Sequence, residues 1–271
     1  MRAAKVATPV PARPAAAVGV APVQMFWSGR PMGDIERLSI RSFQAHGHDV
    51  HLYAFEPVGG VPRGVIVRDA GEVMPRLRAD ELRARGVKPG PLADVFRYAL
   101  LFDRGGWWSD CDVVCLKPWD FTAEIVFGWQ DERVANQAVL RLPAGHEAAR
   151  RLMTLTAHPN RWMRGDPPRR LARKTRDTLL GRRTPEAIAW GATGPAAVTT
   201  VMTGSRLLHR GLSSEVFYPV AWSDSGIFYR PGPLPLGSAT YGVHLWNEVR
   251  GGRQPEAGSP LAAWMELHDV H

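Results

Sequence analysis

Cysteine is scarce in this chain, and the cysteines that it has are badly placed to form a bridge. Cys111 and Cys115 are the only two among 271 residues, four positions apart in one apolar run. On a β-strand they would point to the same face but stand too far apart for a disulfide. As a metal site they lack nearby thiol or imidazole ligands. We therefore expect two reduced thiols in the core, which suggests a reducing compartment.

Long apolar runs are also missing. No stretch approaches the roughly 18–20 apolar residues that a membrane-spanning helix requires. Residues 1–20 are rich in alanine and proline and contain no leucine-rich segment, so we predict a flexible extension there and not a signal peptide. With no leader and no anchor visible, we expect a cytoplasmic protein, with the inner face of the membrane as a peripheral site.

Acidic residues are too few to balance the basic ones, and the imbalance is local. The formal net charge is +8, and residues 161–183 hold nine Lys or Arg and two Asp, so nine minus two leaves +7 in this segment. Three interpretations stay open: a solvated helix, contact with an anionic membrane surface, or contact with nucleic-acid phosphates. The segment has one tryptophan and no base-reading motif, so nucleic acid is the least favoured.

From residue 21 onward the chain alternates between strand and helix patterns. A short buried strand over 21–29 precedes a helical pattern over 34–47, and 49–55 alternates as a strand. Further strands are predicted within 64–74, 107–118, 124–130, 216–222 and 241–246, and further helices within 89–106, 146–159, 169–180 and 194–208. This order predicts an α/β fold with a mostly parallel sheet.

A pair of aspartates interrupts one of these strands. Asp110 and Asp112 flank Cys111, directly after two tryptophans. On an extended backbone both carboxylates face one side and repel each other, unless a cation or water compensates. Carboxylates together with substrate phosphate oxygens hold Mg²⁺ or Mn²⁺. A solvated surface turn is the alternative, although the apolar residues on both sides favour burial.

An acid–base pair lies near the start of the preceding helix. Asp94 and Arg97 are three residues apart, the spacing of a helix-surface ion pair that contributes only a few tenths of a kcal/mol. The other interpretation places both at the carboxyl edge of the sheet, where open α/β folds bind nucleotides. Arg97 would then contact a phosphate or hold Asp94 in place.

Residues 94–112 resemble the signature of the DXD-containing glycosyltransferases of family 32, which include glucosylating bacterial toxins and α-1,4-galactosyltransferase-like proteins. The matching positions are Asp94, Arg97, Gly105, Gly106, Trp108, Asp110 and Asp112. Residues 25–55, 190–199 and 241–247 are similar to other family segments, so the resemblance covers most of 23–250. Trp108 departs from the more familiar tyrosine, and 161–183 is not among the shared motifs.

The resemblance implies a GT-A-type fold, with a Rossmann-like nucleotide-sugar-binding sheet and helices on both faces. It implies a metal-dependent retaining transferase that moves a hexose from a nucleotide sugar, usually UDP-linked, to a glycan or glycolipid acceptor, with Mn²⁺ or Mg²⁺ as the cofactor. We expect one catalytic domain over 21–271, with a donor-binding half at 21–130 and an acceptor-binding half at 131–271. Synthesis of a bacterial surface polysaccharide or glycolipid is the expected role.

The resemblance also implies roles for individual residues. The catalytic set is Asp110, Asp112 and Arg97, with both aspartates binding the metal and Asp112 as the more direct ligand. The donor-binding set is Trp27, which would stack on the base, together with Asp94, Arg97, Trp108, Asp110, His244 and Trp246. Contacts to the acceptor or sugar are assigned to Asn136, Thr193 and Gly194. Asp131, Glu132 and Asn247 are weaker candidates.

Plainer interpretations stay open for several of these residues. His244 and Trp246 would lie on the same face of a strand, which is also typical of a half-buried edge. Thr193 and Gly194 suit the approach to a helix that begins at Pro195. The competing functions are a phosphohydrolase, for which no clear further ligands are visible, and a protein that binds nucleic acid or an anionic surface through 161–183.

Overall fold

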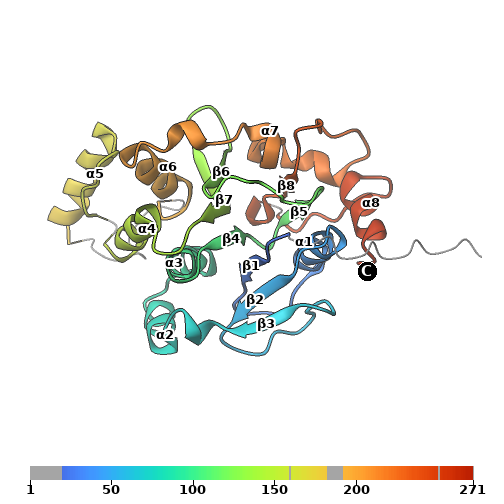
Figure 1. Ribbon diagram of the computed structural model, residues 1–271, viewed down its shortest axis with the longest axis horizontal. Coiled ribbons are helices and arrows are strands. Elements are labelled where there is room, and N and C mark those ends of the chain that lie inside the picture. The colour runs from blue at the N-terminus through green and yellow to red at the C-terminus, as the bar shows by residue number, and fades with distance from the viewer. Residues whose placement is uncertain (1–19, 159, 182–191, 250, 271) are drawn as a thin grey trace, which may run out of the picture.

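The computed structural model describes residues 20–158, 160–181, 192–249 and 251–270 of the chain. These residues form a mixed α/β molecule in which helices cover both faces of a central sheet (Figure 1). The α/β fold class predicted from the sequence is confirmed. The flexible extension predicted over 1–20 lies outside the described residues except for its last position, and it stays a prediction.

The central sheet has six strands in the order β3-β2-β1-β4-β7-β6. β1 pairs in parallel with β2 and with β4, and β2 with β3, whereas β7 is antiparallel to β4 and β6. The strands are β1 Val23–Phe26, β2 Val50–Ala54, β3 Ile66–Asp69, β4 Gly106–Ser109, β6 Val126–Trp129 and β7 Ala135–Leu142. The carboxyl ends of β1, β2 and β4 therefore meet at one edge of the sheet, where β7 begins.

The first elements form the predicted strand–helix–strand unit. β1 and β2 flank helix α1, Asp34–Ala45, and pair in parallel with Val23 opposite Val50. The helix forms because apolar residues recur on one face, and Ile35 and Leu38 are buried there. This crossover brings the start of α1 to the carboxyl edge of the sheet.

A glycine pair separates helix α3, Pro89–Asp103, from β4. Gly105 has a φ of 65°, and a Cβ atom there would lie 2.3 Å from the backbone nitrogen of Ala144. Glycine is required by both the positive φ and the close approach. Because α3 runs back along the sheet before β4 begins, the N-terminal half of α3 lies beside the carboxyl end of β4.

The strand predicted over 107–118 breaks at the paired aspartates. β4 ends at Ser109, and after a turn β5, Val113–Cys115, joins β8, Gly242–His244, in a separate two-stranded sheet. Asp110 and Asp112 therefore lie in a turn between two sheets, and not on one extended strand. The turn, and not strand alternation, brings their carboxylates to one side.

Helices α3 and α4 pack against each other on one face of the sheet, and α1 packs against β2 and β5 on the other. The remaining helices are α2 Arg76–Ala84, α4 Glu147–Ala157, α5 Pro168–Leu179, α6 Pro195–Gly204, α7 Ser214–Phe217 and α8 Pro260–Leu267, with 3₁₀ turns at Ala70–Glu72, Leu208–Arg210, Trp222–Tyr229 and Asn247–Val249. Across the described residues, every helix is too short or too polar to cross a membrane.

Two parts of the predicted topology are wrong. The sequence interpretation left out β7, which is the longest strand, and also α2 and α8. Residues 216–222 were predicted as a strand, but they contain the end of α7 and lead into a 3₁₀ turn. Pro219 lacks the N–H group that a ladder needs, and Phe217 and Tyr218 are buried by packing and not by pairing.

The two cysteines are free and buried, as predicted. Cys111 lies in the turn between β4 and β5, and Cys115 ends β5. The predicted boundary between the donor-binding and acceptor-binding halves falls between β6 and β7, which are neighbours in the same sheet. The division into halves stays a prediction.

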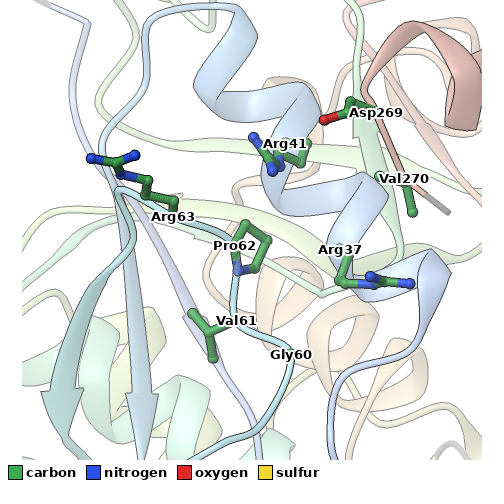
Figure 2. A pocket seen from close by; sticks show the side chains of 8 residues that line it. All are labelled: Arg37, Arg41, Gly60, Val61, Pro62, Arg63, Asp269 and Val270. Atoms are coloured by element: carbon green, nitrogen blue, oxygen red, sulfur yellow. The ribbon is translucent and has the colours of Figure 1, made fainter.

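A cavity of about 260 Å³ opens on the outer side of α1 (Figure 2). Arg37, Arg41 and Arg63 line it together with the C-terminal residues Asp269 and Val270. None of the residues that line this cavity belongs to the predicted site.

Candidate active site

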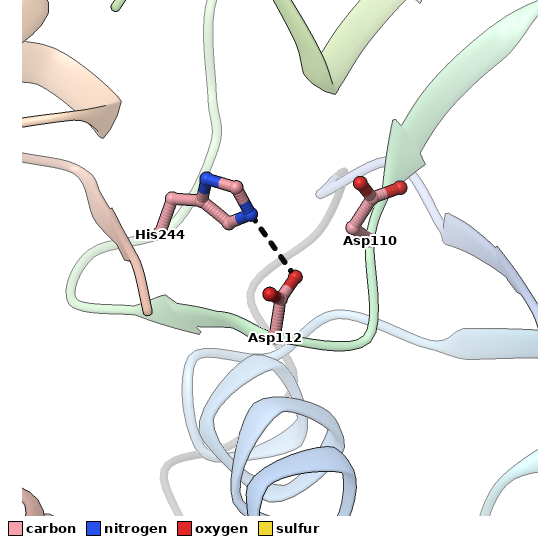
Figure 3. Close-up of side chains that lie close together, drawn as sticks. All are labelled: Asp110, Asp112 and His244. Carbon is pink, nitrogen blue, oxygen red and sulfur yellow. Dashed lines mark ion pairs between the residues drawn. The ribbon is translucent and has the colours of Figure 1, made fainter. Parts of the chain in front are cut away.

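Three side chains meet at the carboxyl edge of the central sheet. One ligand atom from each of Asp110, Asp112 and His244 lies within 4.8 Å of the other two (Figure 3). Asp110 follows the last residue of β4, Asp112 precedes β5, and His244 ends β8. Because Val113 pairs with His244, the β5–β8 sheet carries the histidine to the aspartates from a distant part of the sequence.

Asp112 is held by two donors. Nε2 of His244 lies 3.2 Å from Oδ1, and the backbone N–H of Asn247 donates to Oδ2 at 2.9 Å. Burial acts to raise the pKa of Asp112, but the charge and hydrogen bond of His244 and the N–H of Asn247 outweigh it, so the pKa is lowered. The surroundings of Asp112 therefore favour its ionised form.

Asp110 is oriented through one of its oxygens. Nη2 of Arg97 donates to Oδ1 at 2.6 Å, and Nε1 of Trp108 donates to the same atom at 2.8 Å. Burial and the neighbouring charge of Asp112 raise the pKa of Asp110 to about 6, against the opposing effect of Arg97. The other oxygen, Oδ2, accepts no hydrogen bond from the described residues.

Arg97 connects α3 to the end of β4. Its side chain is 3% exposed, and it pairs with Asp94 at 3.1 Å and with Asp110 at 2.6 Å. Burial acts to lower the pKa of Arg97, but the two carboxylates outweigh it and raise the pKa. Nη1 also donates to the carbonyl of Gln137 on β7 at 3.2 Å. The pair is thus part of a buried network, and not the surface ion pair that was the alternative.

Helix α6 begins beside Asp94. The Thr193 hydroxyl donates to Oδ2 of Asp94 at 2.7 Å. Burial raises the pKa of Asp94, and Arg97 and the Thr193 hydroxyl oppose that effect. Gly194 is the N-cap residue, and Pro195 is the first residue of the helix, as the helix-start interpretation expected. Thr193 therefore joins the network, and Gly194 turns the chain into α6.

The tryptophans near the site have different surroundings. Trp108 is 1% exposed, and its ring lies 4.8 Å from the Arg97 guanidinium, so it leaves almost no face for a ligand. Trp27 follows β1 and is half-buried, and its indole N–H donates to the carbonyl of Arg30 at 2.7 Å. Of the two, Trp27 is the one with exposed surface at the sheet edge.

Trp246 lies beside His244 but not on the same strand face. β8 ends at His244, and Trp246 adopts a left-handed φ of 56°, so the prediction of a shared strand face is wrong. The two rings still lie 4.1 Å apart, and Nε1 of Trp246 donates to the carbonyl of Val220 at 2.9 Å. The left-handed turn after β8, and not strand alternation, brings the rings together.

The site residues predicted on the β6–β7 hairpin, Asn136 and Asp131, form hydrogen bonds with nearby backbone N–H groups. Asn136 is buried, and its side-chain oxygen accepts the N–H of Ala138 at 2.8 Å. The carbonyl of Ala138 in turn accepts the N–H of Asp110 at 2.8 Å. Asp131 caps the hairpin turn through the N–H groups of two following residues. Glu132 is exposed.

Sequence reasoning missed a carboxylate that supports the cluster from α1. Glu36 is 2% exposed; its Oε1 accepts the Asn247 side-chain N–H at 3.0 Å, and its Oε2 accepts the N–H of Gly33 at 2.7 Å. Asn247 thereby links Glu36 to Asp112. In the sequence Glu36 occurs in the first turn of a helix, a common place for a capping residue, so no local signal points to this role.

The donor set fits a hard divalent cation. Two carboxylates, which suit Mg²⁺ and Mn²⁺, converge with one imidazole, which is a ligand of transition-metal ions. The aspartates would repel each other without a positive charge between them. Nδ1 of His244 is buried and has no hydrogen-bond partner among the described residues. The residues therefore fit the metal that the sequence predicted, without identifying it.

Comparison with known proteins assigns the chain to a class. Residues 74–128 match the family described as glycosyltransferase sugar-binding region containing DXD motif. The chain is 32% identical over 194 residues to lactosylceramide 4-alpha-galactosyltransferase of Gorilla gorilla gorilla, a match that covers 65% of this chain and 50% of that protein. The protein of the same name from Pongo pygmaeus is also 32% identical over 194 residues, with 65% of this chain and 76% of that protein covered.

The chain belongs to this family of DXD-containing glycosyltransferases, as the sequence resemblance indicated. It spans about half the length of the first curated relatives that it matches, 50% for the gorilla protein and 47% for the Homo sapiens protein. Among solved structures, the PaToxG glycosyltransferase aligns with a TM-score of 0.47 and 12% identity, over 70% of this chain and 72% of that chain. The matched curated relatives are mammalian, so a bacterial polysaccharide role stays a prediction.

Proposed function

We propose that the protein is a metal-dependent retaining glycosyltransferase that moves a hexose from a nucleotide sugar to a glycan or glycolipid. The observation that carries the proposal is the convergence of Asp110, Asp112 and His244 at the carboxyl edge of the sheet. Open α/β folds bind nucleotides at this edge. A phosphohydrolase is less well supported, because within the described residues the cluster contains these three ligands and no further acidic or histidine group.

Asp112, Asp110 and His244 would hold the cation. A bound Mn²⁺ or Mg²⁺ supplies positive charge that stabilises the departing nucleoside diphosphate. Asp112 suits direct ligation because its surroundings favour the ionised form. Asp110 would add its free oxygen, since its other oxygen is committed to Arg97 and Trp108.

Arg97 and Trp108 act on the donor through Asp110 in this proposal. Both side chains are buried, and both donate to the same carboxylate oxygen. The sequence assigned them direct donor contacts, but the burial of the Trp108 ring favours a positioning role. Asp94 would in turn hold Arg97 from its other side.

Trp27 and Trp246 border the proposed donor site. Trp27 has exposed surface after β1, and we assign it to the nucleobase, with uracil as the first candidate. Trp246 and His244 would close over the diphosphate. In the retaining reaction the bond from C1 of the sugar to the diphosphate oxygen breaks, and the bond to the acceptor oxygen forms on the same face of the sugar. The proton of the acceptor hydroxyl passes to the departing diphosphate.

The acceptor would approach from the side of α6. Thr193 contacts the Asp94 carboxylate there, and a helix N-terminus with its free N–H groups suits polar hydroxyl groups. The matched relatives are named for galactosyl transfer to lactosylceramide. We therefore propose UDP-galactose as the first donor to test and a glycolipid or glycan hydroxyl as the acceptor.

Release of nucleotide from a panel of UDP-sugars and GDP-sugars tests the proposal without an acceptor. The wild-type protein, Asp112→Asn and the control Asp103→Asn would be compared with Mn²⁺ and with chelator. Asp103 ends α3 with 59% of its side chain exposed, so it matches the chemistry of the substitution away from the site.

We expect Mn²⁺-dependent release from one donor, lost by at least about a hundredfold in Asp112→Asn and retained in Asp103→Asn. Release that survives chelation or the Asp112→Asn substitution would contradict a metal–diphosphate site. No release from any donor, together with no metal-dependent nucleotide binding, would reject the enzyme assignment and return attention to residues 161–183.

A further inference from the structure

The basic segment 161–183 divides into residues used inside the molecule and residues that face outward. Lys174 is 2% exposed; its Nζ pairs with Asp166 at 2.7 Å and donates to the carbonyl of Arg161 at 2.8 Å. Arg170 donates to the carbonyl of Ala196 and to the hydroxyl of Thr200 on α6. Arg170 therefore fixes α5 against α6, and Lys174 ties α5 to residues 161–166, so both cations are unavailable to a partner.

The opposite face of α5 is exposed, basic and apolar together. Arg169, Ala172, Arg176 and Leu179 are spaced by three, four and three residues, so they form one stripe, and all four are exposed. Leu179 is 82% exposed, and Leu180, which follows it, is 59% exposed. An exposed leucine pair at the end of an arginine stripe is unusual for a helix that only faces water.

A nearby tryptophan is exposed but is linked to the other face of α5. Trp162 is 64% exposed and lies in segment 161–166, which both contacts of Lys174 tie to the buried face of the helix. Trp162 is therefore not counted as part of the outward stripe. In Figure 1, α5 lies at one end of the molecule, with its outer side free of other described elements.

We propose that the outward face of α5, defined by Arg169, Arg176, Leu179 and Leu180, docks on an anionic lipid bilayer. The negative surface of the leaflet attracts the arginines, and the leucines enter the boundary between head groups and acyl chains. Nucleic acid would use the charge alone and leave the exposed apolar side chains in water. The combination therefore favours a membrane.

This surface is connected to the site through α6. Arg170 fixes α5 to Ala196 and Thr200, and the residue before the N-cap of α6, Thr193, contacts the Asp94 carboxylate. Docking would hold the acceptor side of the site near the bilayer, where a glycolipid head group lies. This last step rests on the proposed function, whereas the docking itself does not.

Flotation of the full chain with vesicles tests the proposal. Vesicles of phosphatidylcholine alone would be compared with vesicles that contain about one third phosphatidylserine. The variants are Arg169→Gln/Arg176→Gln and Leu179→Gln/Leu180→Gln. The control is Leu77→Gln/Arg78→Gln on α2, where both side chains are exposed and the leucine is 72% exposed.

We expect the wild type and the control to bind the anionic vesicles, and each α5 variant to bind at least about tenfold more weakly. Equal binding of both vesicle types, or unchanged binding of the α5 variants, would overturn the proposal. Tight binding to single-stranded DNA that is lost in the arginine variant but kept in the leucine variant would assign the surface to nucleic acid instead.

Nucleotide release from the soluble donor, measured in the same samples, separates the two proposals. Docking residues lie outside the site, so release is expected to continue in the α5 variants while vesicle binding falls. Vesicle binding without release from any donor and without metal-dependent nucleotide binding would support the surface and reject the proposed enzyme.

Discussion

At the scale of single residues, the two aspartates of the signature have opposite surroundings. Asp112 accepts from His244 and from a backbone N–H, which lowers its pKa, whereas burial and its acidic neighbour raise the pKa of Asp110 to about 6. Arg97 then holds Asp110 in place from the core. Two chemically identical residues thus take different parts in one site, because different elements surround them.

Arg97→Met is predicted to destabilise the fold strongly. It leaves the carboxylates of Asp94 and Asp110 without their buried cation, and breaking a buried pair in this way costs about 3–5 kcal/mol. Urea denaturation would measure the loss. Arg104→Met is the control: its ion pair with Glu72 is partly exposed, so about 1 kcal/mol or less is expected. Equal losses in both variants would contradict the buried network.

Glu36→Gln is predicted to weaken metal binding without touching a ligand. Glu36 orients Asn247, and the backbone N–H of Asn247 donates to Asp112. An amide keeps the volume of the side chain but has one acceptor oxygen where the carboxylate has two. Substitutions of residues that support metal ligands lower metal affinity by about tenfold or more, so a loss of about tenfold is expected. A titration with Mn²⁺, monitored by electron paramagnetic resonance, would measure the loss of metal affinity. If Glu36→Gln and the exposed control Glu81→Gln bind Mn²⁺ equally well, Glu36 does not support the metal site.

At the scale of elements, the signature could be predicted because its parts are local in sequence. The helix start, the Gly105–Gly106 break and the end of β4 follow one another. A shared site for Arg97 and the aspartates was therefore one of two interpretations of the sequence, and the family resemblance favoured it. β7 gave no such signal: it follows the polar turn 130–134, and Asn136, Gln137 and Arg141 interrupt its apolar residues, although the strand is held by β4 and β6 on both sides. Whether such a segment forms a strand depends on its pairing with neighbouring strands and not on its local sequence.

The late part of the site could not be read from local patterns. Aromatic and branched residues at 216–222 suggested a strand. Residues 216–218 are instead buried by packing, Trp222 is 58% exposed, and Pro219 lacks the N–H group that strand pairing needs. Trp246 was placed correctly beside His244 for the wrong reason, since a left-handed turn and not strand alternation brings it there. Glu36 was missed because its partner lies far away in the sequence.

Gly105→Ala is predicted to cost more than about 1 kcal/mol, because the residue has a positive φ and its Cβ would meet the backbone of Ala144. Gly90→Ala on the same helix is the control, since a Cβ there meets nothing within 4 Å and the substitution should be neutral or slightly stabilising. Thermal unfolding compares them. A tolerated Gly105→Ala would show that the α3–β4 junction is not fixed by this contact.

His48 is predicted to make the fold sensitive to acid. Burial lowers its pKa, and the neutral ring accepts the N–H of Trp119 at Nε2 while Nδ1 contacts the carbonyl of Ala21. As pH falls below about 6.5, the unfolded imidazole takes up a proton that the folded one resists, so stability falls. The stability is fully present above that pH.

Unfolding free energies at about pH 7.5 and 5.5 measure this effect. The wild type and the control His158→Gln, whose histidine is exposed, should lose about 1 kcal/mol more over this interval than His48→Gln. The same loss in all three proteins would assign the acid sensitivity to other groups.

At the scale of the whole molecule, the site exists because two sheets meet. The turn between the two sheets carries Asp110 and Asp112, and the β5–β8 sheet supplies His244. Helix α1, helix α3 and the approach to α6 add supporting contacts through Glu36, Arg97 and Thr193. Membership of the glycosyltransferase family agrees with this arrangement, and the donor, the acceptor and the membrane surface are proposals built on it.

A crystal structure with Mn²⁺ and a UDP-sugar tests the central claim most directly, because the anomalous signal of manganese locates the ion without assumptions. The account predicts one anomalous peak bound by Asp110, Asp112 and His244, with diphosphate oxygens completing the coordination and the base beside Trp27. A diphosphate bound elsewhere, or an ion that leaves this cluster empty, would contradict the account.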